Sequence, residues 1–485
     1  MGSTGLPGRI GCGMYIAMPW VQRYLINREF ARLWYGQAVS TVGDMIFDTT
    51  LVLWVATVLA KGKSWAPAAV SGIMLSVGIA VMVVGPLAGV FVDRWNRGLT
   101  MLRTEVLRAI MVAALAALAF LPISALPIWL WLALIYVVVF VVNASEQFFN
   151  PSRFATIGDV VSGDVDRARA AGIGQATQAV AAIVGPPLAA PLLFTVGLQW
   201  ALVVNAASYV VSFLAIRSIR LDRTVPERAI GSNLWSEFVA GLKMFASNRF
   251  LVALLTIAVI AQLGTGAMNT LDVFFLTDNL HANAHLLGFI SMVFGVGAII
   301  GALSAGRIVK WFGARRTTWV ALTLAGIVVL VFARQTLFVA GLVAFFFVAV
   351  PVTVLNTSIT PLMLSATPRE YLGRMLAVFN PINMAASMVS VVLAGWLAST
   401  ALLHFHMEIG GLHFGRIDTI FTLSGLLIVA GGVYAAIALP PDPPATPEPS
   451  DGEPGVVVGE IAEIAAPGVV PTQGVTEPLI DPAGG

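Results

Sequence analysis

The sequence has 485 residues and a net charge of +2; 58% of the residues are hydrophobic and 11% are charged. About a quarter of the residues of a soluble globular chain are charged, and a soluble protein this apolar would expose large hydrophobic patches. The composition therefore excludes an ordinary soluble domain and predicts an integral membrane protein. The one cysteine, Cys12, excludes an internal disulfide, and the sequence contains no Cys/His zinc pattern.

Apolar stretches long enough to cross a bilayer repeat along the chain. A membrane helix needs about 20 residues. Breaks at charged residues, Gly and Pro leave twelve such stretches, at 36–60, 68–92, 99–121, 126–149, 168–194, 198–219, 251–276, 285–311, 317–334, 336–361, 371–400 and 417–439. No apolar segment typical of a secretion signal precedes Cys12, so we expect the first span to stay in the membrane. The predicted fold class is an all-α integral membrane protein with twelve transmembrane helices.

Basic residues alternate between the two sides of these spans and predict the orientation. One side carries Arg9, Arg23, Arg28, Arg32, Arg94, Arg97, Arg103, Arg153, Arg167, Arg169, the 217–249 connection, Arg307, Lys310, Arg315, Arg316, Arg369 and Arg374. The other side carries Lys61, Lys63, Arg334 and Arg416. Both termini are therefore expected in the cytoplasm, as an even number of spans requires.

Two polar segments divide the chain. Residues 220–250 separate six spans from six, and "NLWSEFVAGLKMF" within them predicts an amphipathic helix on the inner membrane surface. Residues 441–485 contain eight acidic residues and no Lys or Arg, and this Pro-rich composition predicts disorder. The expected domains are a cytoplasmic segment 1–35, a six-helix bundle 36–219, the linker 220–250, a second bundle 251–440 and the acidic tail 441–485.

A charged turn after the second span has an echo in the second half of the chain. "GVFVDRWNRG" (89–98) and "GRIVKWFGARR" (306–316) occupy equivalent places after spans 2 and 8, and both combine a Gly, a charge four residues later, an aromatic residue and closing arginines. Repetition at this distance indicates two related six-helix bundles in parallel orientation.

The first of these turns resembles the loop 2–3 signature of the major facilitator superfamily. The family has Gly where this chain has Asn96, and the second copy has Lys310 where Asp would stand. "NREFARLWYGQAVSTVGD", "FFNPSRFATIGDVV" and "ATPREYLGRMLAVFN" resemble the branch that contains macrolide-efflux and enterobactin-exporter proteins. The resemblance covers roughly residues 27–440 and implies a transporter with two six-helix bundles.

The signature residues are Gly89, Asp93, Arg94, Arg97 and, at the start of span 11, Arg374. The resemblance implies a cytoplasmic latch in which Asp93 meets Arg374 or the start of span 11 and joins the two bundles. Acidic residues contribute little to topology, which favours the latch for Asp93. Arg94 and Arg97 have the alternative role of topology signals.

Span 5 contains a Pro-kinked stretch of small residues, "GIGQATQAVAAIVGPPLAA". It resembles the antiporter motif of the superfamily, with Ala in place of Gly at three positions, and the matching residues are Gly172, Ala181, Gly185, Pro186, Ala189 and Ala190. Small residues allow close helix contact. The resemblance implies an exporter, and the alternative is a packing helix without directional meaning.

Asp44 and Asp48 lie one turn apart on the same face of span 1. Counted from Arg32 at about 1.5 Å per residue, they lie roughly 18 and 24 Å into the membrane. A carboxyl group in a low-dielectric interior favours its neutral form, and two neighbouring carboxyl groups strengthen this preference. Both are candidates for proton coupling, and a hydrogen-bonded structural role is the alternative, for Asp44 above all.

Other charges also lie within the spans. Arg108 lies about ten residues into span 3, three residues after Glu105. The two are expected to form a structural pair or to line a cavity. Glu146 is expected to pair with Arg153. Asp272, near the outer end of span 7, is a weaker candidate.

Neutral polar residues and aromatic residues are candidates for a mixed cavity, with helix packing as the alternative. They are Asn143, Gln175, Gln178, Asn205, Gln262, Asn269, Asn356, Asn380, Asn383, Trp54, Phe149, Phe274 and Phe379. All five histidines, His281, His285, His404, His406 and His413, fall in predicted outer loops. "HFHME" (404–408), if extended, places His404, His406 and Glu408 on one side as a candidate metal or pH sensor; a solvated loop is the default.

Nucleotide-binding loops, nucleophile elbows and zinc-protease motifs are absent from the sequence. We therefore expect no enzyme activity, no metal, no cofactor and no nucleic-acid partner. The predicted function is a monomeric, proton-coupled transporter in a bacterial plasma membrane that exports amphipathic small molecules such as drugs or a siderophore. The alternatives are a lipid or metabolite carrier or a uniporter of the same fold, and a membrane sensor or scaffold that acts through the acidic tail.

Overall fold

A computed structural model describes residues 25–92, 94–219, 242–243, 246–366, 372–409 and 412–439. Most of the predicted linker helix lies outside these ranges, as do the acidic tail, Cys12 and Asp93. The first half of the described chain contains α2 (Arg28–Trp54), α3 (Ala66–Ile79), α4 (Gly85–Val92), α5 (Arg97–Leu118), α6 (Ile128–Val160), α7 (Asp164–Pro191) and α8 (Leu198–Arg217). The second half contains α10 (Arg249–Phe274), α11 (Leu287–Phe312), α12 (Ala314–Ala333), α13 (Phe338–Ala366), α14 (Leu372–Trp396) and α15 (Arg416–Ala438). We refer to these two groups as the N-half and the C-half.

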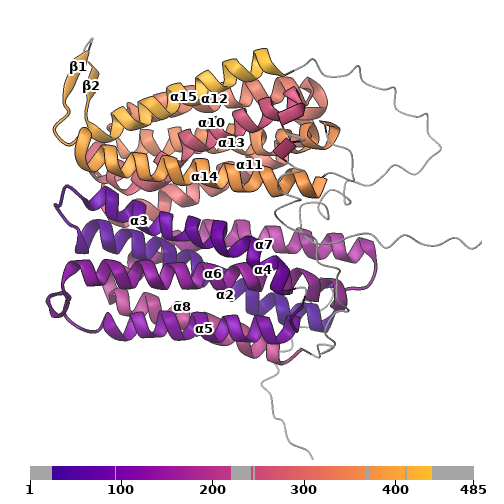
Figure 1. Cartoon of the computed structure of the whole chain (residues 1–485). Coiled ribbons are helices and arrows are strands. Elements are labelled where there is room, and N and C mark those ends of the chain that lie inside the picture. Colours follow the sequence, from indigo (N-terminus) through magenta and orange to yellow (C-terminus); the bar gives the residue numbers. More distant parts are fainter. Residues whose placement is uncertain are drawn as a thin grey trace, which may run out of the picture.

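The two halves form two bundles of parallel and antiparallel helices, one below the other in Figure 1. Within the described residues, eleven helices are long and apolar enough to cross a membrane, with α3 and α4 counted as one rod joined by a π-helical turn at Ala80–Val84. The twelfth is α5, whose 22 residues connect opposite ends of the bundle and carry Arg103, Glu105 and Arg108. The prediction of twelve membrane helices in two bundles is confirmed.

The main packing contacts of the N-half have counterparts in the C-half. The contacts α2–α8, α2–α7, α5–α8 and α3–α6 correspond to α10–α15, α10–α14, α12–α15 and α11–α13. Helices α2, α7, α10 and α14 each continue into a π-helical turn, at Val55–Leu59, Leu192–Val196, Phe275–Asn279 and Leu397–Ala401. The repeated signature in the sequence therefore reflects a repeated three-dimensional unit.

Two boundaries differ most from the predicted spans. Helix α2 begins at Arg28 rather than 36, because the side chain of Asn27 accepts a hydrogen bond from the amide of Phe30 (2.8 Å) and caps the helix there. Helix α6 continues through Pro151 to Val160, eleven residues beyond the predicted end at 149. Arg153, predicted in a loop, therefore lies on a helix. Neighbouring helices tolerate such a Pro in membrane bundles.

A short antiparallel hairpin interrupts the all-helical fold. Strands β1 (Met407–Ile409) and β2 (Leu412–Phe414) pair with Glu408 opposite His413. His404 and His406 precede β1, so the predicted extended arrangement does not include them. The hairpin marks one end of the bundle, which we call the hairpin end (Figure 1). We call the opposite end, where α2 begins and α15 ends, the basic end, because Arg28, Arg32, Arg167 and Arg217 lie there.

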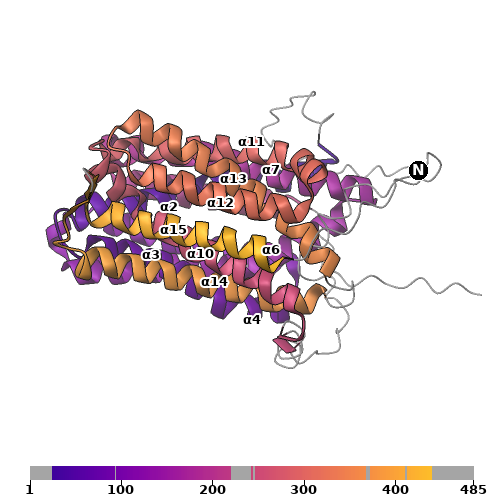
Figure 2. The same ribbon diagram turned by 90° about the horizontal axis from the view of Figure 1, so that it is seen from above.

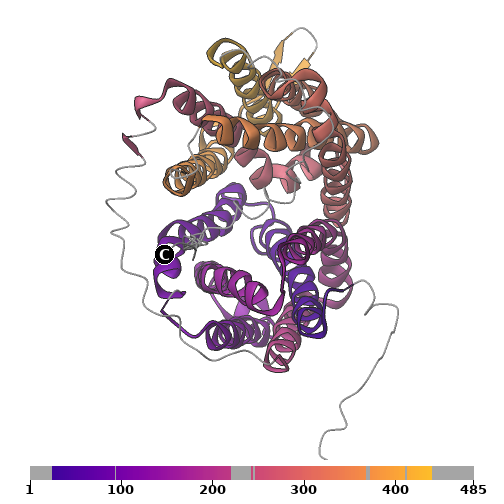
Figure 3. The same ribbon diagram turned by 90° about the vertical axis from the view of Figure 1, so that its right-hand side faces the viewer.

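The halves contact each other mainly through two helix pairs. Helix α7 packs against α11, and α3 packs against α14 (Figure 2). The view along the helices in Figure 3 shows the N-half and the C-half as two groups on either side of this contact. One large apolar core cluster includes residues from both halves, such as Val52 and Val273.

Candidate functional site

Asp44 is held in the N-half by a tyrosine of another helix. The hydroxyl group of Tyr209 in α8 donates a hydrogen bond to Asp44 in α2, and the side-chain amide of Asn205 donates to the Tyr209 hydroxyl (3.3 Å). Gly43 allows this contact, because a side chain at this position would clash: its Cβ atom would lie 2.6 Å from the Oδ1 atom of Asn205. Close approach of α2 and α8 thus brings the acid and the phenol together.

Arg108 lies at the centre of the N-half, with only 3% of its surface exposed. Its guanidinium lies over the rings of Phe149 and Tyr209, 5.5 and 5.2 Å from their centroids. It forms an ion pair with Glu146 (3.6 Å) and donates to the carbonyl of Val142 (3.4 Å). The predicted pairs Arg108–Glu105 and Glu146–Arg153 were both wrong, because Arg108 turns toward α6 instead of along its own helix.

Glu105 is fully buried, and its side chain bonds to helix α8. Its Oε1 atom accepts a hydrogen bond from the hydroxyl of Ser212 (2.6 Å), and the side-chain amide of Gln37 donates to Ser212 (3.0 Å). Its Oε2 atom has no hydrogen-bond partner. Arg153 donates to Gln37 (3.4 Å) and completes this chain toward the basic end. Glu105 and Arg108 therefore lie inside the bundle in this conformation and do not line an open cavity.

Asp48 is partly exposed one turn beyond Asp44 and makes no hydrogen bond or ion pair with the residues that the structure describes. Asp44, Glu146 and Arg108 lie within electrostatic reach of it. The site therefore gathers four carboxyl groups, those of Asp44, Asp48, Glu105 and Glu146, around the guanidinium of Arg108, with the guanidinium of Arg153 nearby. Four ionised carboxylates would outnumber these two cations, which is costly in a low-dielectric interior. The arrangement is suited to taking up and releasing protons.

Sequence reasoning missed three partners in this site: Gln37, Tyr209 and Ser212. Gln37 lies two helical turns before Asp44 on the same face of α2. Asn205, Ser208, Tyr209 and Ser212 form a polar stripe at helical spacing in "NAASYVVS" of α8. The stripes could have been found from the sequence, but which helix each one faces depends on tertiary packing.

The latch residues are only partly described. Arg94 is exposed, and Arg97 forms an ion pair with Asp159 at the end of α6 (2.8 Å) within the N-half. Gly89 lies in α4. Asp93 and the side chain of Arg374 lie outside the described residues, so their proposed contact stays a prediction.

The small residues of α7 lie at two helix contacts. Ala181, Gly185, Pro186, Ala189 and Ala190 are buried, whereas Gly172 is exposed. A Cβ atom at Gly185 would collide with Met45 of α2, and a Cβ atom at Gly288 of α11 would collide with the backbone of Pro186 and Pro187. The stretch thus lets α7 lie close to its own half and to the other half at once.

Some of the polar and aromatic residues predicted to line a cavity are buried in the structure, and others are exposed. Trp54, Phe149, Phe274 and Asn205 are buried, and Trp54 packs edge-on against Trp131. These four belong to the core. Gln175, Gln178, Asn269, Asn356 and Asn380 are exposed at membrane depth. No group of three or more His, Cys, Asp or Glu residues suited to a metal occurs in the part of the chain that the structure describes.

A cavity of about 680 Å³ opens at the hairpin end between the two halves. Lys61 and Lys63 line it from the N-half, and Asp278, His404 and Arg416 line it from the C-half. Asp278 and Arg416 form an ion pair (2.7 Å). His285 stacks on Phe194 across the two halves, with ring centroids 3.9 Å apart.

Comparison with known proteins points to transporters. The chain is 22% identical to macrolide efflux protein A of Streptococcus pyogenes over 409 residues, which cover 83% of this chain and 93% of the relative. It is 29% identical to the putative bacilysin exporter BacE of Bacillus subtilis, over 58% of this chain and 65% of the relative. It is 24% identical to the multidrug efflux pump Tap of Mycolicibacterium fortuitum, over 67% of this chain and 80% of the relative.

Solved structures share the fold. A bacterial homologue of the iron transporter ferroportin in its inward-facing state aligns with a TM-score of 0.65 at 13% identity, covering 85% of this chain and 98% of that one. The nucleoside transporter NupG aligns with a TM-score of 0.63 at 13% identity, covering 85% and 99%. The family model of the Major Facilitator Superfamily matches residues 33–274 and 258–479. The chain therefore belongs to the Major Facilitator Superfamily, as a multi-pass membrane transporter.

Proposed function

We propose that the protein is a proton-coupled secondary transporter that exports amphipathic small molecules from the cytoplasm. Three relatives support export as the direction, since their names describe macrolide efflux, a putative bacilysin exporter and multidrug efflux. The small residues of α7, which resemble the antiporter motif, support the same direction. Bulky drugs and a siderophore fit this class of cargo.

The carboxyl groups around Arg108 are the observation that carries the proposal. Asp48 is partly exposed without a partner, while Asp44 one turn away bonds to Tyr209. In this proposal a proton enters at Asp48. Asp44, one turn away on the same face of α2, exchanges this proton with Asp48. A change of charge there alters the balance with Arg108 and Glu146, and so links protonation to the packing of α2, α5, α6 and α8.

The contacts between the halves support alternating access. Gly288 meets Pro186, Gly395 meets Ser71, and Gly78 meets Met388, all between the hairpin end and the middle of the helices. The halves are therefore closely packed toward the hairpin end. With the basic end in the cytoplasm, as its arginines favour, we interpret these contacts as closing the protein to the outside, with the cavity of about 680 Å³ on their outer side. The latch between Asp93 and Arg374 would close the basic end in the opposite state.

Everted membrane vesicles with a pH-sensitive dye test the proposal. The vesicles are energised and challenged with a panel of amphipathic drugs and siderophores, for the wild type and for Asp44→Asn and Asp48→Asn. Asp164→Asn is the matched control, because the Asp164 side chain is 90% exposed and pairs only with Arg167. We expect substrate-induced proton release in the wild type and the control, and its loss in the two variants.

Two results would contradict the proposal in different ways. Transport of a cargo without proton movement in the wild type would exclude antiport and leave a uniporter or another coupling ion. Full proton release in both Asp variants would assign coupling to other groups. Tail deletion is a separate check, because a transporter without residues 441–485 should still transport, whereas a scaffold should fail.

A further inference from the structure

Helix α10 of the C-half carries a polar face that the proton site does not use. Gln262, Thr265, Asn269 and Asp272 recur at helical spacing and share one side of the helix. Asn269 is exposed, and the other three are partly exposed, although all four lie within a membrane-spanning helix. The hydroxyl of Thr265 donates to Gln262 (3.1 Å). Polar groups at membrane depth face a bundle interior or a water-filled space.

The pseudo-symmetry of the fold relates this face to the proton site. A shift of 221 positions places Asn27, which caps α2, on Asn248, which caps α10. The same shift places Gly43 on Gly264, and each glycine packs against the last helix of its half. Asp44 and Asp48 then correspond to Thr265 and Asn269. The two polar faces therefore occupy equivalent positions in the two halves.

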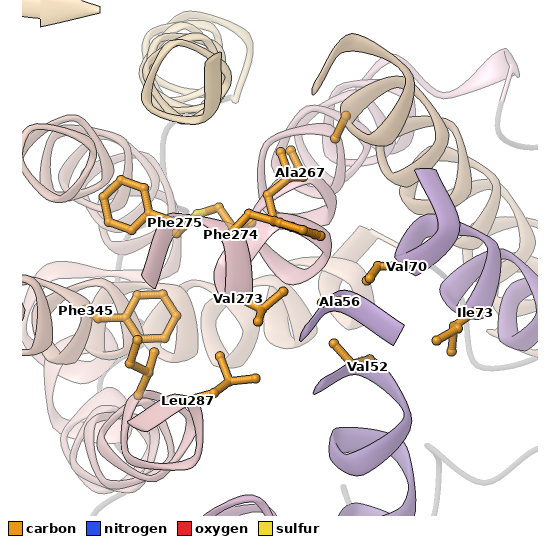
Figure 4. Packing of buried hydrophobic residues seen from close by; sticks show 14 of the residues in the cluster. Val52, Ala56, Val70, Ile73, Ala267, Val273, Phe274, Phe275, Leu287 and Phe345 are labelled. Carbon is orange, nitrogen blue, oxygen red and sulfur yellow. The ribbon is translucent and has the colours of Figure 1, made fainter. Parts of the chain in front are cut away.

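An apolar contact between the two halves lies on the hairpin-end side of both polar faces. In Figure 4, Val273 of α10 points toward Val52 of α2 and Ala56 of the π-helical turn that follows α2, where the two halves meet. All three side chains are buried and belong to one core cluster. Asp48 lies one turn from Val52 toward the basic end, and Asn269 lies one turn from Val273 in the same direction. The two polar faces thus lie just beyond the apolar contact that closes the hairpin end.

Asp272 is the one ionisable group on this face, and it has no partner within the described part of the chain. Its Oδ1 atom is buried and accepts no hydrogen bond. Helix α10 packs against α3, α13, α14 and α15. Among the described side chains of those helices, the ionisable ones other than Tyr434 are Arg416 and Asp418, which pair with Asp278 and Arg334 at the hairpin end. A buried carboxylate without a counter-ion is costly, and a bound cation would offset that cost.

We propose that the polar face of α10 binds the positively charged nitrogen or phosphorus centre of an amphipathic organic cation, with Asp272 as its counter-ion. Asn269 and Gln262 supply hydrogen-bonding groups beside it. The inference rests on the proposed transport function and divides the work between the halves. The N-half carboxyl groups exchange protons, and the C-half carboxylate selects cationic cargo.

Equilibrium binding to the purified full-length protein in detergent, without a proton gradient, tests this assignment. The probes are tetraphenylphosphonium, a permanent lipophilic cation, and triphenylphosphine oxide, a neutral molecule of similar shape. The variants are Asp272→Asn and Asp272→Glu. Asp278→Asn is the matched control. It also removes a carboxylate, six positions after Asp272, but that carboxylate is already paired with Arg416. Near-unchanged melting temperatures establish that each variant is folded.

We expect the wild type to prefer the cation, and Asp272→Asn to weaken cation binding by about tenfold or more, as loss of a charge-assisted contact should. Binding of the neutral probe should stay within about twofold, and Asp272→Glu should restore part of the preference. A wild type without preference for the cation overturns the inference. So does an Asp272→Asn variant that binds both probes as the wild type does, or that loses both equally.

The outcome is separable from that of the proposed function, because the binding measurement needs neither transport nor a proton gradient. Proton release in vesicles that depends on Asp44 or Asp48, together with unchanged cation binding in Asp272→Asn, would leave the antiporter standing and overturn only the role of Asp272. Loss of proton coupling for cationic and neutral cargo alike in Asp272→Asn would make Asp272 a proton carrier and overturn the inference as well.

Discussion

Ser399 of the C-half caps a helix of the N-half: its hydroxyl oxygen accepts a hydrogen bond from the amide of Ala68, 3.0 Å away, in the first turn of α3. Trp65, at the N-cap position of α3, provides no side-chain cap of its own. The first amides of a helix lack partners within the helix. The two halves therefore complete each other at the hairpin end, and separation there leaves this amide without its partner.

Replacement of Ser399 by Ala should favour opening of the hairpin end. A hydrogen bond of this kind contributes about 1 kcal/mol, so the ratio of open to closed molecules should rise about fivefold. Distances between spin labels on Lys63→Cys and His404→Cys, in a Cys12→Ser background, report this ratio. Ser399→Thr keeps the hydroxyl and serves as the control. An unchanged distance distribution in Ser399→Ala would mean that the contact does not contribute to closure.

Substitution of Gly288 should prevent close contact between α7 and α11. A Cβ atom there would collide with the backbone of Pro186 and Pro187, which cannot rotate away as a side chain can. We expect Gly288→Ala to fold, to lose the closed hairpin end in the same spin-label measurement, and to lose most transport. Gly306→Ala lies on the same helix with nothing within 4 Å of the added atom and should behave as the wild type. Equal activity of the two variants would contradict this assignment.

The fold was predictable from the sequence because each span is a separate, local property. Hydropathy places twelve helices, and the echo of "GVFVDRWNRG" at "GRIVKWFGARR" indicates the two halves. The ends of the helices were less predictable. Pro151 indicated the end of a helix, whereas α6 continues through it to Val160. Backbone hydrogen bonds and neighbouring helices, which the sequence pattern does not describe, decide such an end.

The site was predictable only in part. Asp44, Asp48, Glu105 and Arg108 are visible as charges in apolar spans, but their partners come from distant segments. Tyr209 is 165 residues from Asp44, and Ser212 is 107 residues from Glu105. The expectation that Arg108 pairs with Glu105 at i,i+3 failed because Glu146 and two aromatic rings offer Arg108 a better environment. Spacing along one helix does not reveal such competition.

Removal of the Tyr209 hydroxyl should uncouple Asp44 from its surroundings. A hydrogen bond to a charged group contributes about 1.5–3 kcal/mol, while the ring of Phe would keep its contact with Arg108. We expect Tyr209→Phe to reduce substrate-induced proton release in vesicles by about tenfold with little change in expression. Tyr136→Phe makes the same chemical change at a hydroxyl that bonds to the carbonyl of Ala69 and should leave proton release intact. Similar loss in both variants would indicate a structural effect.

Loss of either member of the Arg108–Glu146 pair should destabilise the N-half. Breaking a buried ion pair costs about 3–5 kcal/mol, since it leaves one charge without a partner. Thermal unfolding in detergent should show a fall in melting temperature for Glu146→Gln, which leaves the buried charge of Arg108 without this partner, and for Arg108→Gln, which also removes the contacts of Arg108 with two aromatic rings. The fall for the double variant should be less than the sum of the two. Asp164→Asn breaks the exposed pair with Arg167 and should cost under about 1 kcal/mol. Additive losses in the double variant would mean that the two residues do not interact.

Cys12, the one cysteine of the chain, allows the orientation to be measured without an engineered label site. A membrane-impermeant maleimide should label it in everted vesicles and leave it unlabelled in intact cells, because the basic end is expected in the cytoplasm. A second protein with Cys12→Ser and Lys61→Cys should show the opposite pattern, since Lys61 is exposed at the hairpin end. Labelling of Cys12 from outside intact cells would reverse the orientation. The relative positions of the carboxyl groups would then stand, but the direction in which their protons drive cargo would have to be assigned anew.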